Sequence, residues 1–386
     1  MSKLENFTLP DRGFVFWPVG SGDSTTIVID DDHVMQVDLR QLESSSEEDD
    51  PHAPVADLLE KLLPQKDGKP YLAAFVLTHP DKDHCQGFAD LMDKVSIGEI
   101  WISPRVLSEF DEDLCDDAEA LKDEAERRVK QARNGKTSSG DRVRIIGYAD
   151  ILDEDDYEGF PEEMLTIPGN EVTEIDGEEL SSTFRAFVHA PFKDDAEAER
   201  NDTSVALQIT LKTTGASCRA LLLGDLSNPT VNRIFSISDD ADMEWNVLLA
   251  PHHCSKTVMY VADDDGNDVL DRELMSKIED AGGECRYIVS SSEPIPARNQ
   301  SGDNPPHAKA KNRYEEIVET GHFLCTHERP SEDKPEPIVV RVSDEGCDLD
   351  PVEESSADLS GGVSAAIIEA RGTDTPPTRQ VGFGAS

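Results

Sequence analysis

The stretch THPDKDHCQG, residues 78–87, follows the apolar run LAAFVL and precedes a pattern typical of a helix. It places His79, Asp81, Asp83 and His84, four ligand-type side chains, within six residues. In an extended loop His79 and Asp81 can point the same way, whereas Asp83 and His84 begin the helix and face another side. Such a set can hold two metal ions. A polar turn, with Asp83 capping the helix, is the alternative.

Two further polar clusters also follow apolar runs. Asp225 ends the run RALLLG, and His252 with His253 follows NVLLAP. Loops at the carboxyl ends of strands converge in layered α/β folds, so we expect the three clusters to meet. A carboxylate such as Asp225 can bridge two cations, although on its own it could be a cap or turn residue. One of the two histidines could ligate while the other orients substrate or protonates a leaving group.

Four other residues are possible supports of the site or contacts to substrate. His189 ends a strand and could be a ligand, a cap or a support behind a ligand. Asn201 and Asp202, in RNDTS, could supply oxygen ligands or hydrogen bonds to substrate. His307, in the loop NPPHAK before a helix, could face substrate.

The chain is strongly acidic. Its 386 residues include 81 acidic and 36 basic ones, which gives a formal net charge of −45. Proteins bind nucleic-acid backbones mainly through Lys and Arg, so such a surface repels them at low salt. We interpret the acids as a solvated coat of the kind that halophile proteins carry. A surface that mimics DNA is the alternative. The hydrophobic share of 37% indicates a globular protein.

Cysteine spacing and the N-terminus indicate the compartment. The seven cysteines are scattered and form no C-x-x-C pair, which argues against a disulfide framework or zinc finger and favours a reducing cytoplasm. If the loops converge, Cys85 and Cys254 would lie near each other; small semi-buried thiols are the alternative. No signal peptide or membrane-spanning run is visible. We therefore expect a cytoplasmic protein without a membrane partner.

Apolar periodicity predicts β-β then β-α order, twice over, and therefore two sheets flanked by helices. The expected strands are 13–20, 24–30, 33–39, 73–78, 97–103, 142–149, 183–191, 203–212, 218–226, 245–253, 322–328 and 337–343; the expected helices are 55–63, 87–95, 113–133, 276–282 and 309–321. The charged helix 113–133 is expected to be an exposed excursion, within an insertion at about 108–140. Residues 348–386, acidic and then rich in small residues, are predicted to be a disordered tail after a domain at 1–347.

The motifs H-x-D-x-D-H, a strand ending in GD and a strand ending in PHH-x-S resemble the metallo-β-lactamase superfamily. Asp81 stands where most members have histidine. Together with VGSGDS, NDTS, APHHCSK and NPPHAK, this variant resembles the hydrolase domain of ComEC-type DNA-uptake proteins, without their membrane channel. The resemblance covers roughly 13 to 342. Cys254 departs from the motif, which has glycine there, and Cys85 stands where an aliphatic residue is usual.

This resemblance implies a four-layer αββα sandwich with a site for two divalent ions, Zn²⁺ or Mn²⁺. His79 and Asp81 would serve one ion, Asp83 and His84 the other, and Asp225 would bridge them. His252 or His253 would complete a sphere. The predicted metal ligands are therefore His79, Asp81, Asp83, His84, Asp225 and His252, and the predicted catalytic residues are Asp83 and His253.

The function expected from these residues is metal-dependent hydrolysis, in which Asp83 orients a water molecule and accepts its proton. Asp81 makes the first site harder and shifts the preference from zinc towards manganese. A phosphodiester or nucleic acid is the expected substrate. The alternatives are a small ester, thioester or lactam, and a non-catalytic binding or regulatory module with a structural metal. Basic residues that could line a polynucleotide channel are Arg185, Lys256, Arg298, Lys309, Lys311 and Arg313.

Overall fold

The first sheet starts from the predicted N-terminal hairpin. In the computed structural model, β1 (Gly13–Phe16), β2 (Thr25–Val28) and β3 (Val34–Val37) pair antiparallel, and β3 runs parallel to β5 (Lys69–Val76). Because β5 is covered on both faces, it is a continuous apolar run rather than an alternating one. The strand order is β23-β22-β1-β2-β3-β5-β6-β7-β8, with β4 beside β5. The remaining bounds are β4 (Gln65–Lys66), β6 (Ser96–Ile102), β7 (Arg142–Ile146), β8 (Leu165–Thr166), β22 (Ile338–Ser343) and β23 (Gly346–Leu349).

The second sheet has the strand order β19-β18-β15-β14-β13-β12-β9. Its central strands β14 (Ser217–Leu222), β15 (Trp245–Leu249) and β18 (Gly282–Ser290) are parallel, so the loops that carry Asp225 and His252 leave at the same edge. The other bounds are β9 (Glu171–Val172), β12 (Phe184–Ala190), β13 (Ala206–Lys212) and β19 (Phe323–Cys325). Small hairpins are formed by β10 (Glu174–Ile175) with β11 (Glu178–Glu179), β16 (Tyr260–Ala262) with β17 (Asp268–Leu270), and β20 (Pro330–Ser331) with β21 (Lys334–Pro335).

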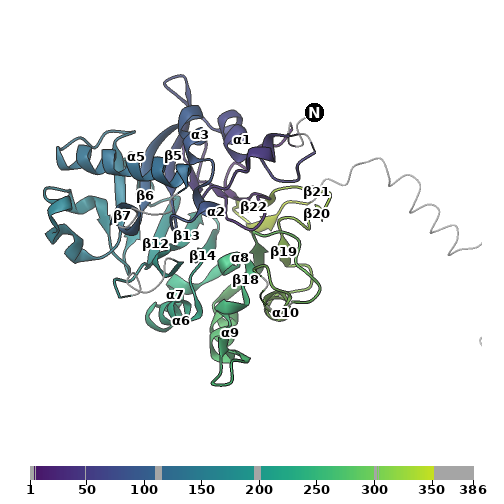
Figure 1. Ribbon diagram of the computed structural model, residues 1–386. Helices are drawn as coiled ribbons and strands as arrows, with labels where there is room; N and C mark the ends of the chain where they lie inside the picture. Colours follow the sequence, from purple (N-terminus) through teal and green to yellow (C-terminus); the bar gives the residue numbers. More distant parts are fainter. Residues whose placement is uncertain are drawn as a thin grey trace, which may run out of the picture. The chain divides into compact units, whose positions relative to one another are not determined.

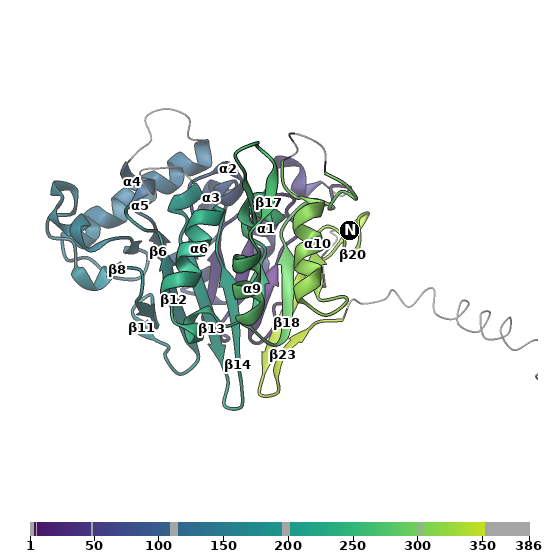
Figure 2. The ribbon, with the colours of Figure 1, turned by 90° about the horizontal axis from the view of Figure 1, so that it is seen from below.

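Helices cover the outer face of each sheet (Figures 1 and 2). One apolar core joins the first sheet to α1 (Val55–Leu62), α3 (Phe88–Lys94) and α5 (Asp116–Arg133). A second core lies between the sheets, and a third joins the second sheet to α6 (Asn228–Ile237), α9 (Arg272–Asp280) and α10 (Ala308–Ile317). The predicted α/β class with αββα layers is confirmed. Short helices are α2 (Lys82–Cys85), α4 (Arg105–Ser108), α7 (Asp240–Met243) and α8 (Pro251–Cys254), with 3-10 turns at η1 (Glu43–Ser46), η2 (Ala149–Asp153), η3 (Asp155–Tyr157), η4 (Glu162–Met164), η5 (Asn201–Thr203) and η6 (Lys256–Val258).

The structure describes residues 4, 6–47, 49–108, 115–194, 201–299, 302 and 304–351. The chain forms two units, Met1–Asp350 and Pro351–Ser386, and the predicted tail beyond Pro351 lies outside the described residues. Across the described ranges, no helix has both the length and the apolar character needed to cross a bilayer.

The expectation that the charged helix is an exposed excursion is wrong. α5 buries Ala118, Leu121, Ala125, Val129 and Ala132, a stripe at three- and four-residue spacing. An apolar stripe this narrow is enough to dock one face of a helix while its other faces stay charged. β18 was not predicted; it begins at Gly282, and only Ala281 separates it from the end of α9.

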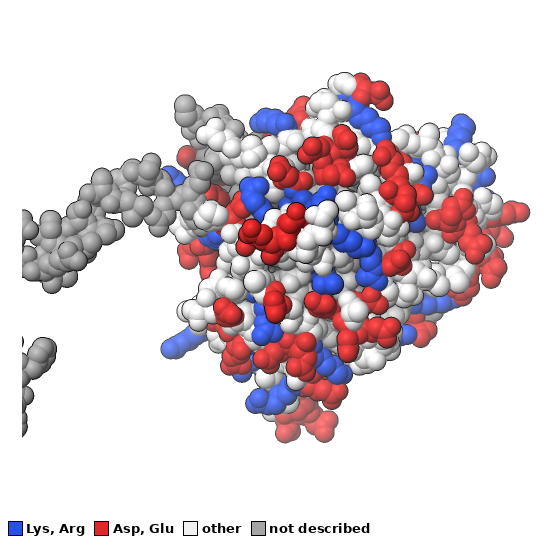
Figure 3. Space-filling view, turned by 180° about the vertical axis from the view of Figure 1, so that it is seen from behind, with Lys and Arg blue, Asp and Glu red and all other residues white. Residues whose placement is uncertain are grey.

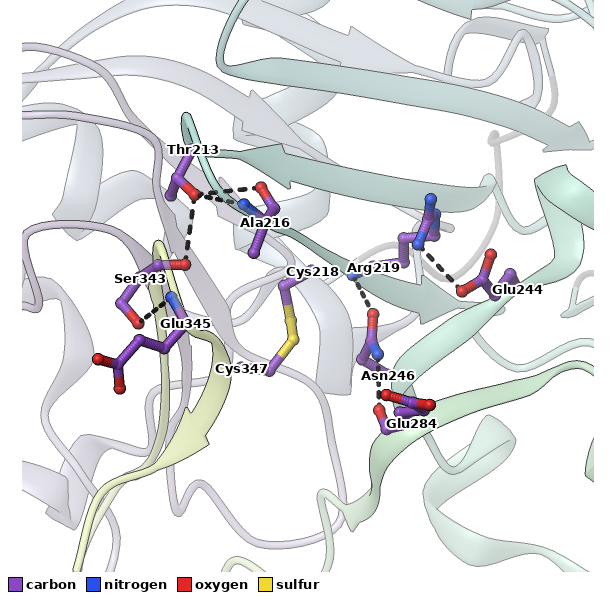
Figure 4. The surroundings of a disulfide bond; sticks show 10 residues. All are labelled: Thr213, Ala216, Cys218, Arg219, Glu244, Asn246, Glu284, Ser343, Glu345 and Cys347. Carbon is purple, nitrogen blue, oxygen red and sulfur yellow. Dashed lines mark hydrogen bonds and ion pairs between the residues drawn. A yellow bond between two sulfur atoms is a disulfide. The ribbon is translucent and has the colours of Figure 1, made fainter.

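A disulfide, Cys218–Cys347, contradicts the expectation drawn from cysteine spacing. It joins β14 of the second sheet to β23 of the first (Figure 4). The two cysteines are 129 positions apart in the sequence, so no local spacing motif could have revealed the pair.

Candidate metal centre

Asp225 lies at the centre of the three clusters, which meet as expected. Its Oδ1 is 3.4 Å from His84 Nε2. Its Oδ2 is 3.4 Å from His253 Nε2, 3.7 Å from His252 Nε2 and 4.0 Å from His79 Nε2. Four histidines from the segments after β5 and β15 therefore face one buried carboxylate.

Asp81 and Asp83 lie on different sides of this group. Asp81 Oδ2 is 3.6 Å from His79 Nε2, and Asp83 Oδ2 is 3.3 Å from His253 Nε2. The two aspartates thus lie apart, but the ring centroids of His79 and His84 are 4.1 Å apart and both rings face Asp225, so the expectation that the two pairs of THPDKDHCQG face different sides is not met.

Asp23 joins the group, and sequence reasoning did not select it. Ligand atoms of Asp23, His84, Asp225 and His253 lie within 4.8 Å of one another, and all four residues are buried. Asp23 belongs to VGSGDS, a motif to whose carboxylate the sequence reasoning gave no role. The motif VGSGDS is the sequence feature from which Asp23 could have been selected.

The buried polar atoms at this site fit a bound metal. Within the described part of the chain, His79 Nε2, His84 Nε2, Asp225 Oδ1 and both ring nitrogens of His253 are buried without a hydrogen-bond partner. Leaving such atoms unpaired in a protein interior is costly, so clusters of them indicate a ligand. Imidazole nitrogens and carboxylate oxygens are the donors that divalent zinc and manganese accept.

Hydrogen bonds on the far side of the His84 and His79 rings orient the Nε2 atoms of these two residues. His84 Nδ1 lies 2.7 Å from Asp38 Oδ2, and His79 Nδ1 lies 3.3 Å from Ser204 Oγ. Asp38 also accepts hydrogen bonds from the backbone N–H and hydroxyl of Thr78. Such partners fix the ring orientation and leave Nε2 available to a metal. Asp38 was missed, although it too is an aspartate directly after a strand.

The His252–His253 segment has an unusual backbone. His252, His253 and Cys254 have φ values of 51°, 52° and 66°, in the left-handed region that non-glycine residues rarely adopt. Cys254 thus takes the conformation that the usual glycine would favour. His307 braces the segment, because its N–H donates to the Cys254 carbonyl and its Nδ1 accepts from Lys256 N–H. The structure therefore places His307 behind the histidine pair.

Gly22 allows the VGSGDS loop to approach α2. A Cβ on Gly22 would lie 2.6 Å from the Asp83 carbonyl oxygen and 2.3 Å from Arg40 Cδ. The backbone N–H of Asp23 donates to the same Asp83 carbonyl. Only glycine fits this close approach, which brings Asp23 to His253.

Ion pairing and burial set the charges at the site. Burial opposes ionisation of Asp225, but the neighbouring His253 and His84 outweigh it and hold the pKa of that carboxyl well below its usual range. Burial lowers the pKa of His252, which is near other histidines. Asp225 is therefore a carboxylate at neutral pH, the form that a cation requires.

The remaining predicted residues lie around the centre rather than in it. His189 is buried against Ser238 Oγ and the Asp242 carbonyl, and burial lowers its pKa to about 4. The Asn201 carbonyl accepts from Ser204 Oγ, whereas Asp202 Oδ1 accepts from the backbone and hydroxyl of Ser227 at the start of α6. Asn201 thus lies behind His79, and Asp202 secures the segment after Asp225.

The two cysteines next to the histidines do not meet. Cys85 packs in the core of the first sheet, and Cys254 packs in the outer core of the second sheet. The Cys85 sulfur instead lies 3.9 Å from that of Cys115.

A second cluster, His52, Glu293 and His327, also brings ligand-type atoms together. His52 Nδ1 contacts Asp50 and its Nε2 contacts Glu293, while His327 Nε2 accepts from the Gly20 N–H. Protein partners satisfy these atoms, so we assign no metal to this cluster.

The predicted basic channel residues are mostly paired with acids. Lys256 and Lys309 share Asp268, and Lys311 contacts Glu328. Arg185 contacts Glu171 and Asp242, and Arg313 contacts Glu316. On the face shown in Figure 3, acidic and basic side chains lie interspersed. These residues do not form a uniform cationic track.

Comparison with known proteins gives similarity only among solved structures. No family model matches the chain, and no curated protein does. A B3 metallo-β-lactamase with an active-site glutamic acid is similar at 13% identity, over 71% of this chain and 86% of that one, with a TM-score of 0.35. BJP-1, a subclass B3 enzyme of Bradyrhizobium japonicum, is similar at 15% identity over 63% and 75%, with a TM-score of 0.30. We draw neither family nor activity from similarities of this size.

Proposed function

We propose that this chain is a metal-dependent hydrolase acting on phosphodiesters, including nucleic-acid strands. The observation that supports this most is the convergence of buried, unpartnered histidine nitrogens on Asp225. A solely structural role does not explain why one side of the group borders solvent. The Asp83 side chain is 38% exposed, whereas those of His253 and Asp225 are 3% and 5% exposed.

The ligand groups follow from the contacts. His79, Asp81 and His252 would hold one divalent ion, Asp83, His84 and His253 a second, and Asp225 would serve both. When bound, the ions would activate a water molecule and stabilise negative charge on a phosphoryl oxygen. We propose His253 as a ligand rather than a proton donor, because its buried ring is shielded from a substrate.

Asp83 would act as the general base that accepts the proton of the water molecule. Its carboxylate reaches His253 on the buried side and solvent on the other. From that position it can orient a water molecule and accept its proton. Asp38 and Ser204 contact the rings of His84 and His79 on the side away from Asp225, and Asp23 Oδ1 lies 3.4 Å from His253 Nδ1.

The donor set and surface favour particular substrates and metals. Carboxylates from Asp81, Asp83 and Asp225 are hard donors, which suit manganese as well as zinc. Because most of the candidate channel cations are paired with acids, a small phosphodiester or a strand end suits this surface better than a long duplex.

One set of assays tests the proposal. Protein purified at low and high salt is analysed for zinc and manganese and then tested on bis-p-nitrophenyl phosphate, single- and double-stranded DNA, RNA and nitrocefin. We expect phosphodiester turnover that is lost in Asp83→Ala and retained in Asp93→Ala, an exposed control in α3. Metal binding without turnover of any substrate would rule out the hydrolase. Turnover of nitrocefin alone would replace the phosphodiester with a lactam.

A further inference from the structure

The end of α2 and the start of α5 bring two free thiols together. Cys85 is the last residue of α2, and Cys115 immediately precedes α5. Their sulfur atoms are 3.9 Å apart, and neither cysteine takes part in the Cys218–Cys347 disulfide. A disulfide has an S–S length of about 2.05 Å, so the sulfurs need to approach by about 1.9 Å. A partly exposed side chain at a helix start can move this far.

We propose that Cys85 and Cys115 are an oxidation site, at which a peroxide converts the two thiols to a disulfide that links α2 to α5. Cys85 lies in the segment THPDKDHCQG, which carries four of the predicted metal ligands. Cys85 directly follows His84, and its sulfur lies 3.3 Å from the Asp81 carbonyl oxygen.

The unequal exposure of the two thiols sets the order of the reaction. Cys85 is fully buried, whereas Cys115 is partly exposed and is the one that a peroxide can reach. The hydrogen bond with Cys85 also lowers the pKa of Cys115, to about 6, which increases its thiolate fraction. Cys115 is therefore the attacking thiol and Cys85 the resolving one.

The chemistry balances with hydrogen peroxide as the oxidant. The Cys115 sulfur attacks one peroxide oxygen, the O–O bond breaks and hydroxide leaves, which gives a sulfenic acid on Cys115. The Cys85 sulfur then attacks the Cys115 sulfur, the S–S bond forms, the S–O bond breaks and water leaves. Two thiols lose two electrons in total, and one peroxide molecule becomes two water molecules.

A second contact shows that α5 already holds this segment. Asp117, in the first turn of α5, accepts hydrogen bonds from the backbone N–H groups of Gly87 and Ala89. The disulfide would add a covalent link at the same place. Oxidation would thereby tie the segment that carries Asp81, Asp83 and His84 to the outer helix layer.

Peptide mapping of the full chain tests this proposal. The folded protein is treated with hydrogen peroxide, alkylated without reduction and digested with trypsin. We expect a disulfide-linked pair of the peptides 83–94 and 106–122, with the loss of two free thiols and two hydrogen atoms. The linked peptides of Cys218 and Cys347 should be present before and after treatment as an internal reference.

Variants separate this pair from general thiol oxidation. The linked peptides should be absent in Cys115→Ser and present in Cys285→Ser, which removes the exposed free cysteine. The decisive measurement is the peptide map of the wild-type chain, and a variant that folds poorly does not affect it. The proposal is overturned if Cys85 stays fully alkylatable while Cys115 proceeds to sulfinic acid, or if Cys285 is the only cysteine oxidised.

Discussion

At the scale of single residues, the site depends on aspartates that hold histidines from behind. Asp38 is fully buried and accepts three hydrogen bonds, from two groups of Thr78 and from His84 Nδ1. Burial raises the pKa of Asp38, although the contact with His84 opposes this effect. The cost of burying this carboxyl group is thus offset by hydrogen bonds from Thr78 and His84 rather than by solvent. Asp38 consequently acts on the centre through His84 and, by way of the Thr78 hydroxyl, through His79.

Replacing Asp38 with asparagine should therefore weaken metal binding without unfolding the chain. The amide retains an acceptor for Thr78 but loses the charge that makes His84 Nε2 a better donor. We expect the affinity for zinc to fall by about 10- to 100-fold, measured by competition with a chelator. Asp31→Asn, at an exposed turn, is the control. Equal affinity in the two variants would contradict this role.

His189 should make the folded chain sensitive to acid. Burial lowers its pKa from 6.5 to about 4, so between these values the unfolded chain binds a proton that the folded chain does not. Stability is therefore lost as the pH falls from 6.5 towards 4. Between pH 7.5 and pH 5 this amounts to about 2 kcal/mol.

Urea unfolding at the two pH values measures the effect. His189→Gln should remove most of this acid-dependent loss, even if its stability at neutral pH is lower. His322→Gln, a partly buried histidine beside β19, is the control and should keep the wild-type pH dependence. An unchanged pH dependence in His189→Gln would show that His189 does not carry the effect.

At the scale of elements, α5 holds the segment that follows the predicted ligands. Asp117 caps the N-terminus of α3 from a different helix, with oxygens 2.9 and 3.0 Å from the N–H groups of Gly87 and Ala89. Gly87 itself has no side chain that could cap this helix. α5 thus contributes an apolar stripe to the core and the Asp117 carboxylate to the N-terminus of α3.

Removing this carboxylate should destabilise the chain measurably. Asp117→Ala should lower the free energy of unfolding by about 1 kcal/mol, the usual value of an N-terminal cap. Denaturant unfolding measures the difference. Asp116→Ala removes the neighbouring exposed carboxylate and should have little effect. If both variants lose the same stability, general helix charge rather than the cap is responsible.

At the scale of the whole molecule, the Cys218–Cys347 disulfide adds a covalent link to the apolar packing between the two sheets. It closes a loop of 129 positions and joins a central strand of one sheet to the edge strand of the other. In the chain-entropy model, a link of this span destabilises the unfolded state by about 5 kcal/mol.

Thermal unfolding with and without a reductant tests this contribution. We expect the wild-type midpoint to fall on reduction, and the double variant Cys218→Ala with Cys347→Ala to melt at a similarly low temperature in both conditions. Cys285→Ser should behave like the wild type. A double variant as stable as the oxidised wild type would show that the link adds nothing.

Much of the fold could be predicted because the apolar runs are long and their order is simple. β5 and β14 were evident as apolar strands, and the polar clusters after them were correctly expected to meet. α5 was located but wrongly expected to be exposed, because five buried apolar positions in a highly charged helix are a weak signal. β18 was missed because its first half, GGEC, begins with two glycines and is not an apolar run, which leaves only YIV as an apolar stretch.

The sequence by itself determined which residue types stand at the strand ends, since hydrophobic periodicity and short-range spacing are local properties. It identified the histidines and aspartates that surround Asp225. Only the tertiary structure decided that Asp38 and Asp23 lie behind His84 and His253, and that Cys85 faces Cys115. These pairs join segments far apart in the chain, and their distances depend on how sheets and helices pack rather than on any local pattern.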